Sequence, residues 1–149
     1  MIALCEDQSV MGSVFYLMER VVGEIFRRDI EQEITAEDVA IMADSFIDGL
    51  VQLHAVDSSL LQEFNKGNGY VQRQVEGWSK RYRSAITDDV PNGEKVMAWL
   101  DANKPDDVDS CVIHGDWRID NVVFDLGKAR IVGVLDWELA TVGDPLMDL

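Results

Sequence analysis

The chain has 149 residues, and its 13 basic and 28 acidic side chains give a formal net charge of -15 at pH 7. That length suits one domain, and the hydrophobic share of 47% is typical of a folded globular chain. Such an acidic surface repels phosphate backbones and anionic lipids, which argues against nucleic acid or a membrane as a partner. No run approaches the roughly 20 apolar residues that cross a bilayer. Two cysteines are too few for a disulfide scaffold, so we expect a cytoplasmic protein.

The first 23 residues predict two strands around a turn. Residues 2–5 are apolar, residues 6–9 are turn formers, and residues 14–22 are rich in β-forming side chains. Gly23 ends the second run. A two-stranded hairpin is marginal alone in water, so we expect further strands to flank it in a longer chain.

A polar connector over residues 24–33 leads to a predicted helix that runs to about residue 54 or 55. Thr35 is a suitable N-cap, and Asp38 follows three residues later in a position typical of a capping box. Apolar residues then recur at helical spacing. They are Val39, Met42, Ala43, Phe46, Leu50 and Leu53.

Two more helices are predicted, after a loop over residues 57–69. One spans residues 70–85 and the other residues 94–102, with Pro91 and Pro105 in the flanking breaks. The first of these helices carries several basic residues that either form a solvated face or grip an anionic substrate. They are Arg73, Lys80, Arg81 and Arg83.

The last third of the chain predicts strands over residues 111–114, 121–125 and 130–136. Residues 126–129 join the second and third of these strands as a hairpin. Strands, then helices, then strands again indicate an α+β fold.

Three polar residues fall at the ends of these last strands. Asp116 and Asn121 share one loop, and the hairpin returns Asp136 to the same edge. Two carboxylates and an amide oxygen are hard ligands that suit Mg²⁺, which also takes water and substrate phosphates. The Asp-x-x-x-x-Asn spacing matches the catalytic loop of kinases.

Longer motifs surround these residues in a recognisable order. They are His-Gly-Asp-Trp-Arg-Ile-Asp-Asn at 114–121, Val-Leu-Asp-Trp-Glu at 134–138 and Gly-Asp-Pro-Leu-Met-Asp-Leu at 143–149. Together with residues 15–21, 53–57 and 73–82, this set resembles the aminoglycoside phosphotransferase and choline kinase family, which has a protein-kinase-like fold. The resemblance is strongest to the kinase-like domains fused to acyl-CoA dehydrogenases and to their bacterial relatives.

The resemblance implies an ATP- and Mg²⁺-dependent kinase that transfers the γ-phosphate to a hydroxyl of a small molecule, either a hydroxylated acyl-CoA or an aminoglycoside-like compound. It implies a role for eight residues. Asp116 would be the catalytic base, Asn121 and Asp136 the metal ligands, Met18, Glu19 and Val21 the adenine-binding hinge, and His114 and Asp148 structural support for the loop.

The resemblance also divides the chain. Residues 1–23 would end the sheet of the N-terminal lobe and form the hinge, and residues 24–149 would be most of the helical C-terminal lobe. No lysine stands in a suitable strand and no glycine-rich loop follows one, although phosphoryl transfer of this kind uses both. We therefore expect the sequence to be part of a longer protein.

Two other functions compete with the kinase. A non-catalytic binding module or inactive remnant would keep the metal-binding half without positioning the γ-phosphate. A metal-dependent phosphohydrolase would need more ligands than the sequence offers.

Single residues also have structural alternatives. Asp116 is also suited to capping a loop and Asp136 to closing a turn, whereas His114 and His54 are better suited to structural roles than to chemistry. Trp117 and Trp137 suit packing as well as substrate stacking. Asp120 suits a turn better than contact with a metal-bound water.

Overall fold

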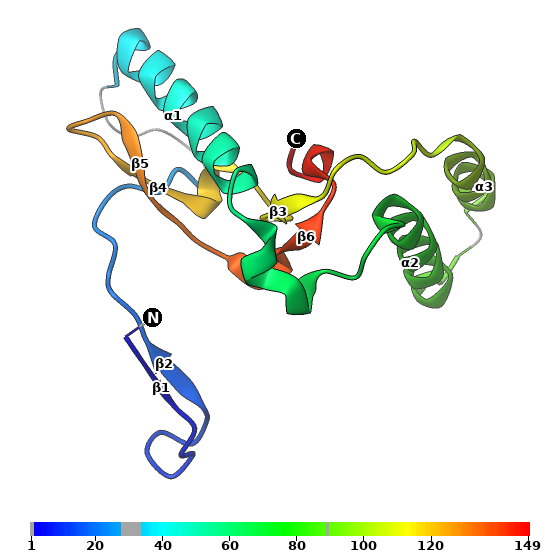
Figure 1. Ribbon diagram of the computed structural model, residues 1–149, viewed down its shortest axis with the longest axis horizontal. Coiled ribbons are helices and arrows are strands. Elements are labelled where there is room, and N and C mark those ends of the chain that lie inside the picture. The colour runs from blue at the N-terminus through cyan, green and yellow to red at the C-terminus, as the bar shows by residue number, and fades with distance from the viewer. Residues whose placement is uncertain (1, 28–33, 89) are drawn as a thin grey trace. The chain divides into compact units, whose positions relative to one another are not determined.

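The computed structural model describes residues 2–27, 34–88 and 90–149, so part of the connector predicted over residues 24–33 lies outside the described residues. Helices and three two-stranded antiparallel sheets alternate along the chain (Figure 1). The chain divides into two compact units. We call residues 1–47 with 118–135 the hairpin unit, and residues 48–117 with 136–149 the helical unit.

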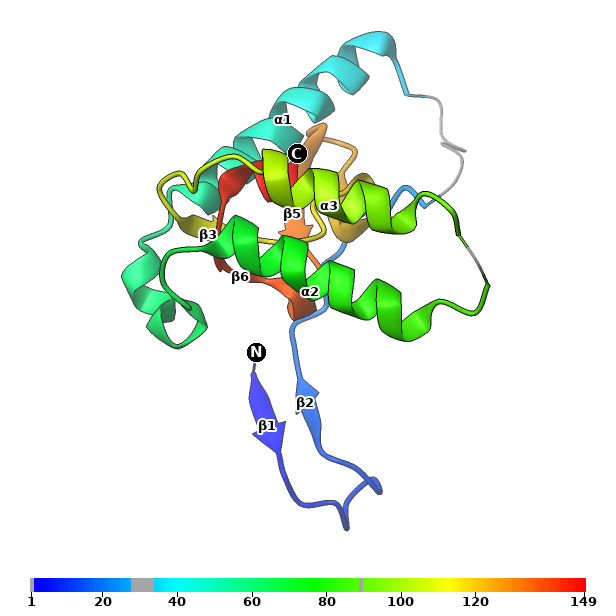
Figure 2. The ribbon, with the colours of Figure 1, turned by 90° about the vertical axis from the view of Figure 1, so that its right-hand side faces the viewer.

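The hairpin unit begins with the predicted pair of N-terminal strands. β1 (Ala3–Cys5) and β2 (Phe15–Leu17) are antiparallel (Figure 2). β2 is shorter than the predicted run of residues 14–22, because only three of its residues have a pairing partner in the three-residue strand β1.

α1 (Ala36–His54) begins and ends where the sequence predicts, and the capping box is confirmed. The Asp38 amide donates to Thr35 Oγ1 at 3.1 Å, and the Thr35 amide donates back to Asp38 Oδ2 at 3.2 Å. Two otherwise unsatisfied backbone donors at the helix start are thereby paired.

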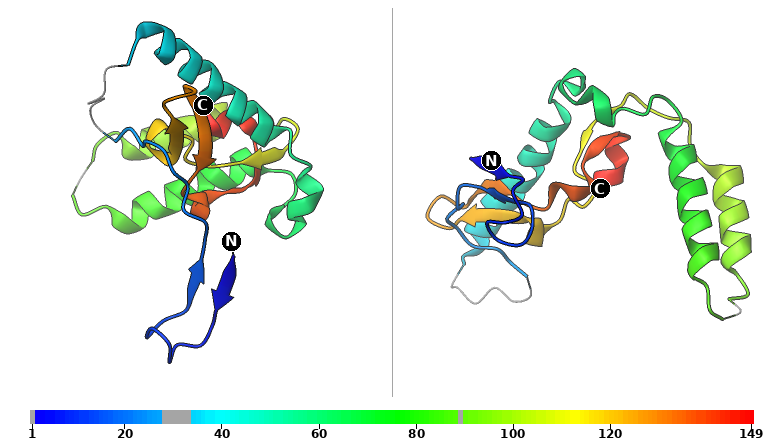
Figure 3. Two further views of the ribbon diagram at one scale, coloured as in Figure 1. Left: turned by 90° about the vertical axis from the view of Figure 1, so that its left-hand side faces the viewer. Right: turned by 90° about the horizontal axis from the view of Figure 1, so that it is seen from below.

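The β4–β5 hairpin is confirmed, with β4 at Val122–Asp125 and β5 at Arg130–Val134. The first half of α1 lies beside it (Figures 1 and 3), and the Ile131 amide donates to Ser45 Oγ at 3.0 Å. The core of this unit contains Phe26 and Phe124, whose ring centroids are 5.6 Å apart.

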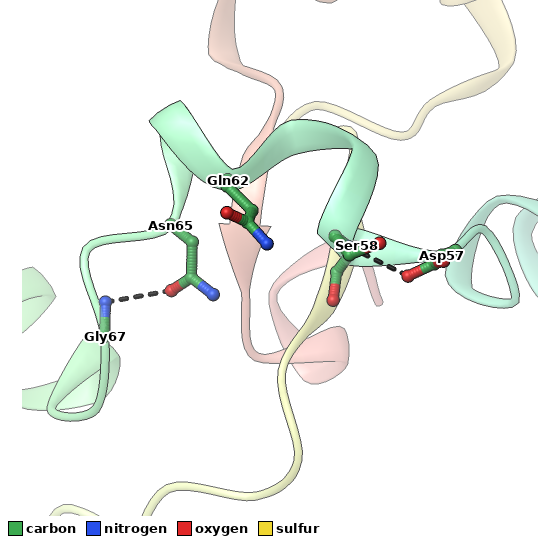
Figure 4. Close-up of a pocket in the computed structure, with 6 residues that line it drawn as sticks. Asp57, Ser58, Gln62, Asn65 and Gly67 are labelled. Carbon is green, nitrogen blue, oxygen red and sulfur yellow. Dashed lines mark hydrogen bonds between the residues drawn. The ribbon is translucent and has the colours of Figure 1, made fainter.

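The helical unit corrects one prediction. The sequence predicts a loop over residues 57–69, but η1 (Ser58–Phe64) consists of 3₁₀ turns on either side of a kink at Leu61, whose φ is -123° and ψ 36°. Asp57 caps it by accepting the Ser59 amide at 2.9 Å, and the chain meets no glycine until Gly67, whose amide donates to Asn65 Oδ1 (Figure 4). A good cap and the absence of a helix breaker therefore favour helical turns here.

α2 (Tyr70–Ala85) matches its predicted range, and α3 (Gly93–Asn103) is one residue longer at each end than predicted. The two helices lie side by side (Figures 2 and 3), and Arg83 holds Glu94 through two hydrogen bonds of 2.9 and 2.8 Å. Arg73 donates to the carbonyls of Gly67 and Asn68, and Arg81 lies over the Trp78 ring. Three of the four basic residues of α2 thus contact the protein itself.

The strand predicted over residues 111–114 is β3 (Cys111–Ile113), and its partner β6 (Thr141–Gly143) was not predicted. Three short 3₁₀ helices, also unpredicted, complete the described residues: η2 (Ile119–Asn121), η3 (Trp137–Leu139) and η4 (Pro145–Asp148).

Among the described residues, no single helix is long and apolar enough to cross a membrane. α1 and η1, bent by 73° at the break between them, meet the length and composition requirement only as a pair.

A carboxylate distant in sequence caps the start of α2. Gly69, which precedes the helix, has no side chain to offer, so Asp107 accepts the amides of Val71 and Gly69 instead. These hydrogen bonds, that from Val71 first, lower the pKa of Asp107 below its ordinary value of 3.8. A group whose pKa is lowered on folding adds stability above its unfolded pKa and loses it as the pH falls through the folded pKa.

We predict that Asp107→Asn lowers the thermal unfolding midpoint by about 2–5 °C at pH 7, because an amide is a weaker acceptor for two helix N–H groups. The deficit relative to the unsubstituted chain should begin to shrink as the pH falls below about 4, the ordinary pKa of an unfolded aspartate, and should vanish only below the lower folded pKa of Asp107. The measurement is thermal unfolding followed by circular dichroism from pH 3 to pH 7. Asp106→Asn, an exposed neighbour, is the control, and an equal effect in both variants would contradict the capping role.

Candidate active site

The carboxylate of Asp148 joins three segments of the helical unit. Its Oδ2 accepts the His114 amide at 2.9 Å, and its Oδ1 accepts the Gly115 amide at 2.7 Å. His54 Nε2 lies 3.0 Å from Oδ2. The Asp148 side chain is 0% exposed, so these polar partners replace the water that its charge has lost.

η4 presents Asp148 to this loop. Asp144 caps the short helix by accepting the Leu146 amide at 2.9 Å, and Pro145 starts it. Proline suits the first helical position because its missing N–H has no partner there. The run Gly-Asp-Pro-Leu-Met-Asp thus builds a local support for one carboxylate.

His114 is buried and holds the loop from inside. Its ring lies between Trp117, at 5.8 Å between centroids, and Trp137, at 4.9 Å. Its Nδ1 accepts the Asp116 amide at 3.3 Å, which assigns the ring proton of the neutral form to Nε2. A buried ring that accepts a backbone N–H is placed to shape the loop rather than to take a proton from a substrate.

Gly115 has a backbone that other residues adopt with difficulty. Its φ is +83°, and a Cβ at this position would lie 2.8 Å from the Leu139 carbonyl oxygen. A side chain here would be strained and would also collide with backbone. Because protein kinases carry arginine at this place, Gly115 distinguishes the loop from theirs.

Asp116 follows this support directly. Its amide is fixed by His114, and its side chain is half-buried in the helical unit. The loop therefore holds the backbone of the predicted base by two neighbouring contacts, one through Gly115 and one through its own N–H.

Asn121 lies in the hairpin unit at the end of η2. Its carbonyl accepts the Leu135 amide at 2.8 Å, and its own amide donates to the Arg118 carbonyl at 3.0 Å. Asp136 comes directly after Leu135, is exposed, and has φ 65° and ψ 55°, the left-handed region. Asp136 is therefore the next residue after Leu135, whose amide is hydrogen-bonded to the Asn121 carbonyl.

The oxygen donors of Asn121 and Asp136 fit a hard cation. Within the described ranges, no group of three or more His, Cys, Asp or Glu side chains is arranged to hold a metal ion. Amide and carboxylate oxygens are the donor type that suits Mg²⁺, which also takes water and phosphate, better than Zn²⁺.

The predicted hinge, Met18 to Val21, is an exposed segment without regular structure. Val21 packs on Gly133 of β5, where a Cβ would lie 2.8 Å from Val21 Cγ1. Among the described residues, no backbone hydrogen bond uses the Glu19 carbonyl or the Val21 amide.

Burial and nearby negative charge raise the pKa of two side chains, Tyr70 and Cys111. Burial raises the pKa of Tyr70, and the charges of Asp148 and Asp144 raise it further. Burial likewise raises the pKa of the Cys111 thiol, with the same two carboxylates adding to the shift. Both groups therefore stay neutral at pH 7 beside the loop.

The geometry described so far defines a class of protein. An α+β fold with a His-Gly-Asp loop, a following hairpin and an aspartate that accepts the loop amides is that of the kinase-like phosphotransferases. Comparison with known proteins agrees: the model of the phosphotransferase enzyme family matches residues 1–149, and the chain belongs to that family.

Relatives of known name are close. Acyl-CoA dehydrogenase family member 11 is 40% identical in Homo sapiens over 99% of the chain, and 44% identical in Gallus gallus over 97%. The chain spans 19% of the length of each.

Solved structures support the fold. A Ralstonia eutropha structure with a provisional aminoglycoside phosphotransferase assignment is 35% identical to the chain and has a TM-score of 0.85. The match covers 97% of this chain and 45% of that protein. A macrolide 2'-phosphotransferase type I has the same fold, with 24% identity and a TM-score of 0.63. That match covers 91% of this chain and 46% of the macrolide enzyme.

Sequence reasoning assigned His54 to packing in the core and missed its contact with Asp148. The two residues are 94 positions apart, so periodicity within α1 gave no signal of this contact. A histidine at the end of an otherwise apolar helix stripe was the one available indication that a polar partner lies nearby.

We predict that Asp148→Ala lowers the free energy of unfolding by about 2–4 kcal/mol, because two buried loop amides and His54 lose their acceptor together. His54→Ala should cost about 1 kcal/mol, since the amides keep theirs. Urea denaturation of both variants measures the difference. Met147→Ala, an exposed neighbour on η4, is the control, and a cost for Asp148→Ala no larger than the control's would contradict the joining role.

Proposed function

We propose that the chain contributes the catalytic loop, the metal ligands and the hinge of an ATP- and Mg²⁺-dependent kinase that phosphorylates a hydroxyl of a small molecule. The observation that carries this proposal is the buried Asp148 carboxylate, which holds the His114 and Gly115 amides and so fixes the loop that bears Asp116. The family match over the whole chain supports the same reaction class.

Asp116 is the proposed base. The acceptor hydroxyl oxygen attacks the γ-phosphorus of ATP, the bond from that phosphorus to the bridging oxygen breaks, and ADP leaves. The hydroxyl proton passes to the Asp116 carboxylate. Because the Asp116 amide is fixed by His114, the loop orients the hydroxyl with little movement, and positioning supplies much of the rate.

Asn121 and Asp136 are the proposed ligands of Mg²⁺, which, when bound, would neutralise charge on the phosphates. Their oxygens are the donor type that Mg²⁺ takes in proteins. The bond between the Asn121 carbonyl and the Leu135 amide supports this pairing, because it fixes the residue before Asp136.

The hinge is proposed to bind adenine through the Glu19 carbonyl and the Val21 amide, beside Met18. The contact between Val21 and Gly133 supports this role, because it holds the hinge backbone against β5. Residues 1–23 then form the end of the N-terminal lobe sheet and the hinge. Residues 24–149 form most of the helical C-terminal lobe.

The acceptor is proposed to be a hydroxylated acyl-CoA. The relatives that carry the name acyl-CoA dehydrogenase family member 11 match nearly the full chain at 40% identity, closer than the 35% of the structure with the aminoglycoside assignment. The competing acceptor is an aminoglycoside-like compound, and the transfer assay below compares the two.

Nucleotide binding tests the metal site first. Isothermal titration of ATP into the chain should show Mg²⁺-dependent binding, and Asp136→Asn should weaken it by about 10-fold or more, because a carboxylate ligand is lost. Asp109→Asn, an exposed loop acid, is the matched control and should bind as the unsubstituted chain does. Binding that is equal with and without Mg²⁺ would contradict the metal assignment.

The proposed base has a separate test. We predict that Asp116→Asn reduces phosphoryl transfer by about 10²–10⁴-fold while ATP affinity stays within about threefold, because the base acts on the acceptor proton and not on the nucleotide. Transfer from labelled ATP to a hydroxyacyl-CoA and to an aminoglycoside is the measurement. Unchanged transfer in the variant would rule out Asp116 as the base.

A further inference from the structure

One face of α2 combines an exposed tryptophan with a basic side chain. Trp78 is 62% exposed, although tryptophan is highly buried on average. The guanidinium carbon of Arg81 lies 4.7 Å from the centroid of the Trp78 ring. Arg81 follows Trp78 by three positions, so the two side chains are neighbours on the helix surface. Together they form an aromatic and cationic patch on α2, and both residues are exposed.

The neighbouring helix packs on the other side of α2. There Arg83 pairs with Glu94 of α3 at 2.8 Å. Gln72 Nε2 lies 3.4 Å from Asp101 Oδ1 of the same helix. The exposed side of α2 follows the i, i+3, i+4, i+7 spacing of a single helix face. Its residues are Gln74, Gly77, Trp78 and Arg81. The two helices therefore meet through polar side chains and leave the tryptophan outside.

Gly77 leaves room beside this patch. Glycine is less favourable than alanine inside a helix, and the φ of Gly77 is not in the left-handed region that would favour it. Among the described residues, no atom outside the local helix backbone lies within 4 Å of the position that a Cβ of Gly77 would take. Neither backbone conformation nor packing therefore explains this glycine. A helix surface without a side chain lets a ligand approach the backbone closely.

The charge of α2 is opposite to that of the chain. The helix has four basic residues and one acidic residue, whereas the whole chain has 13 and 28. Lys80 and Arg81 are exposed, and in the described part of the chain neither forms an ion pair. A partner that is both anionic and planar suits this face, because its ring can stack on Trp78 and its charge can pair with the two cations.

The proposed acceptor contains such a group. A CoA thioester ends in an adenosine that carries a 3'-phosphate. α2 begins at the sheet that leads to the Asp116 loop, since Tyr70 packs on Gly143 of β6, and β6 pairs with β3. Trp78 lies eight residues after Tyr70, about 12 Å along the helix axis. These elements all belong to the helical unit, so the pantetheine arm of the thioester can run along α2 toward the loop.

We infer that Trp78 and Arg81 bind the 3'-phosphoadenosine end of a CoA thioester, with Lys80 beside them. The choice of ligand rests on the proposed function. The adenine stacks on the Trp78 ring beside Gly77, and Arg81 and Lys80 pair with the 3'-phosphate. ATP has no 3'-phosphate, so this contact distinguishes the acceptor from the phosphate donor.

CoA and dephospho-CoA, which differ only in the 3'-phosphate, are the probes. Isothermal titration of each into the chain should show about 10-fold higher affinity for CoA, because charge-assisted hydrogen bonds to the phosphate are present only there. Arg81→Gln should reduce this preference to about threefold or less. Trp78→Leu should weaken both probes by about 10-fold, since base stacking is lost.

Two further variants separate binding from damage to the helix. Trp99→Leu is the matched control, since Trp99 is 63% exposed on α3, and it should bind both probes as the unsubstituted chain does. Gly77→Ala should raise the thermal unfolding midpoint and yet weaken CoA binding by about threefold or more, because a methyl group fills the space beside Trp78. Equal weakening in Trp99→Leu and Trp78→Leu would overturn the inference, and so would an unchanged preference for CoA in Arg81→Gln.

The unsubstituted chain distinguishes failure of this inference from failure of the proposed function. If it binds Mg²⁺-ATP but binds neither probe, or binds both equally, the CoA contact is wrong and the kinase assignment stands. If it prefers CoA to dephospho-CoA and binds no Mg²⁺-ATP, the CoA contact stands and the kinase assignment is contradicted.

Discussion

One buried carboxylate organises the loop of the helical unit. Asp148 accepts two consecutive backbone amides, those of His114 and Gly115, and lies within hydrogen-bond distance of His54 at the end of α1. Burying a charge is costly unless polar partners replace its water, and these three contacts supply such partners. The position of the Asp116 amide depends on them, because Gly115 and His114 are its immediate support.

The excess of acidic residues is partly structural. Asp38, Asp57 and Asp107 each accept a backbone amide at or near the start of a helix, and in each case hydrogen bonding lowers the pKa. Asp144 accepts a backbone amide in the same way for η4. Carboxylates suit these places because they pair with donors that a helix leaves unsatisfied and oppose its positive end.

Sequence reasoning succeeded where structure is determined by neighbours. The capping pair of Thr35 and Asp38 depends on residues three positions apart, and the turn between β4 and β5 is equally local. It failed where a distant partner decides. β6 is three residues long and is a strand because it pairs with β3, and the polar partner of His54 is Asp148, 94 residues further along the chain. Three-residue patterns and long-range pairs leave no periodic signal.

The backbone at Asp136 gives a reason to look for chemistry there. A left-handed conformation costs a residue with a side chain about 1 kcal/mol, and glycine would avoid that cost. At Gly115, where the backbone is also left-handed, the chain does use glycine, because the Leu139 carbonyl leaves no room for a side chain. At Asp136 the chain accepts the strain and keeps an exposed carboxylate. Ala129 also has a positive φ, at the turn before β5, but its side chain is buried, whereas the Asp136 carboxylate is exposed.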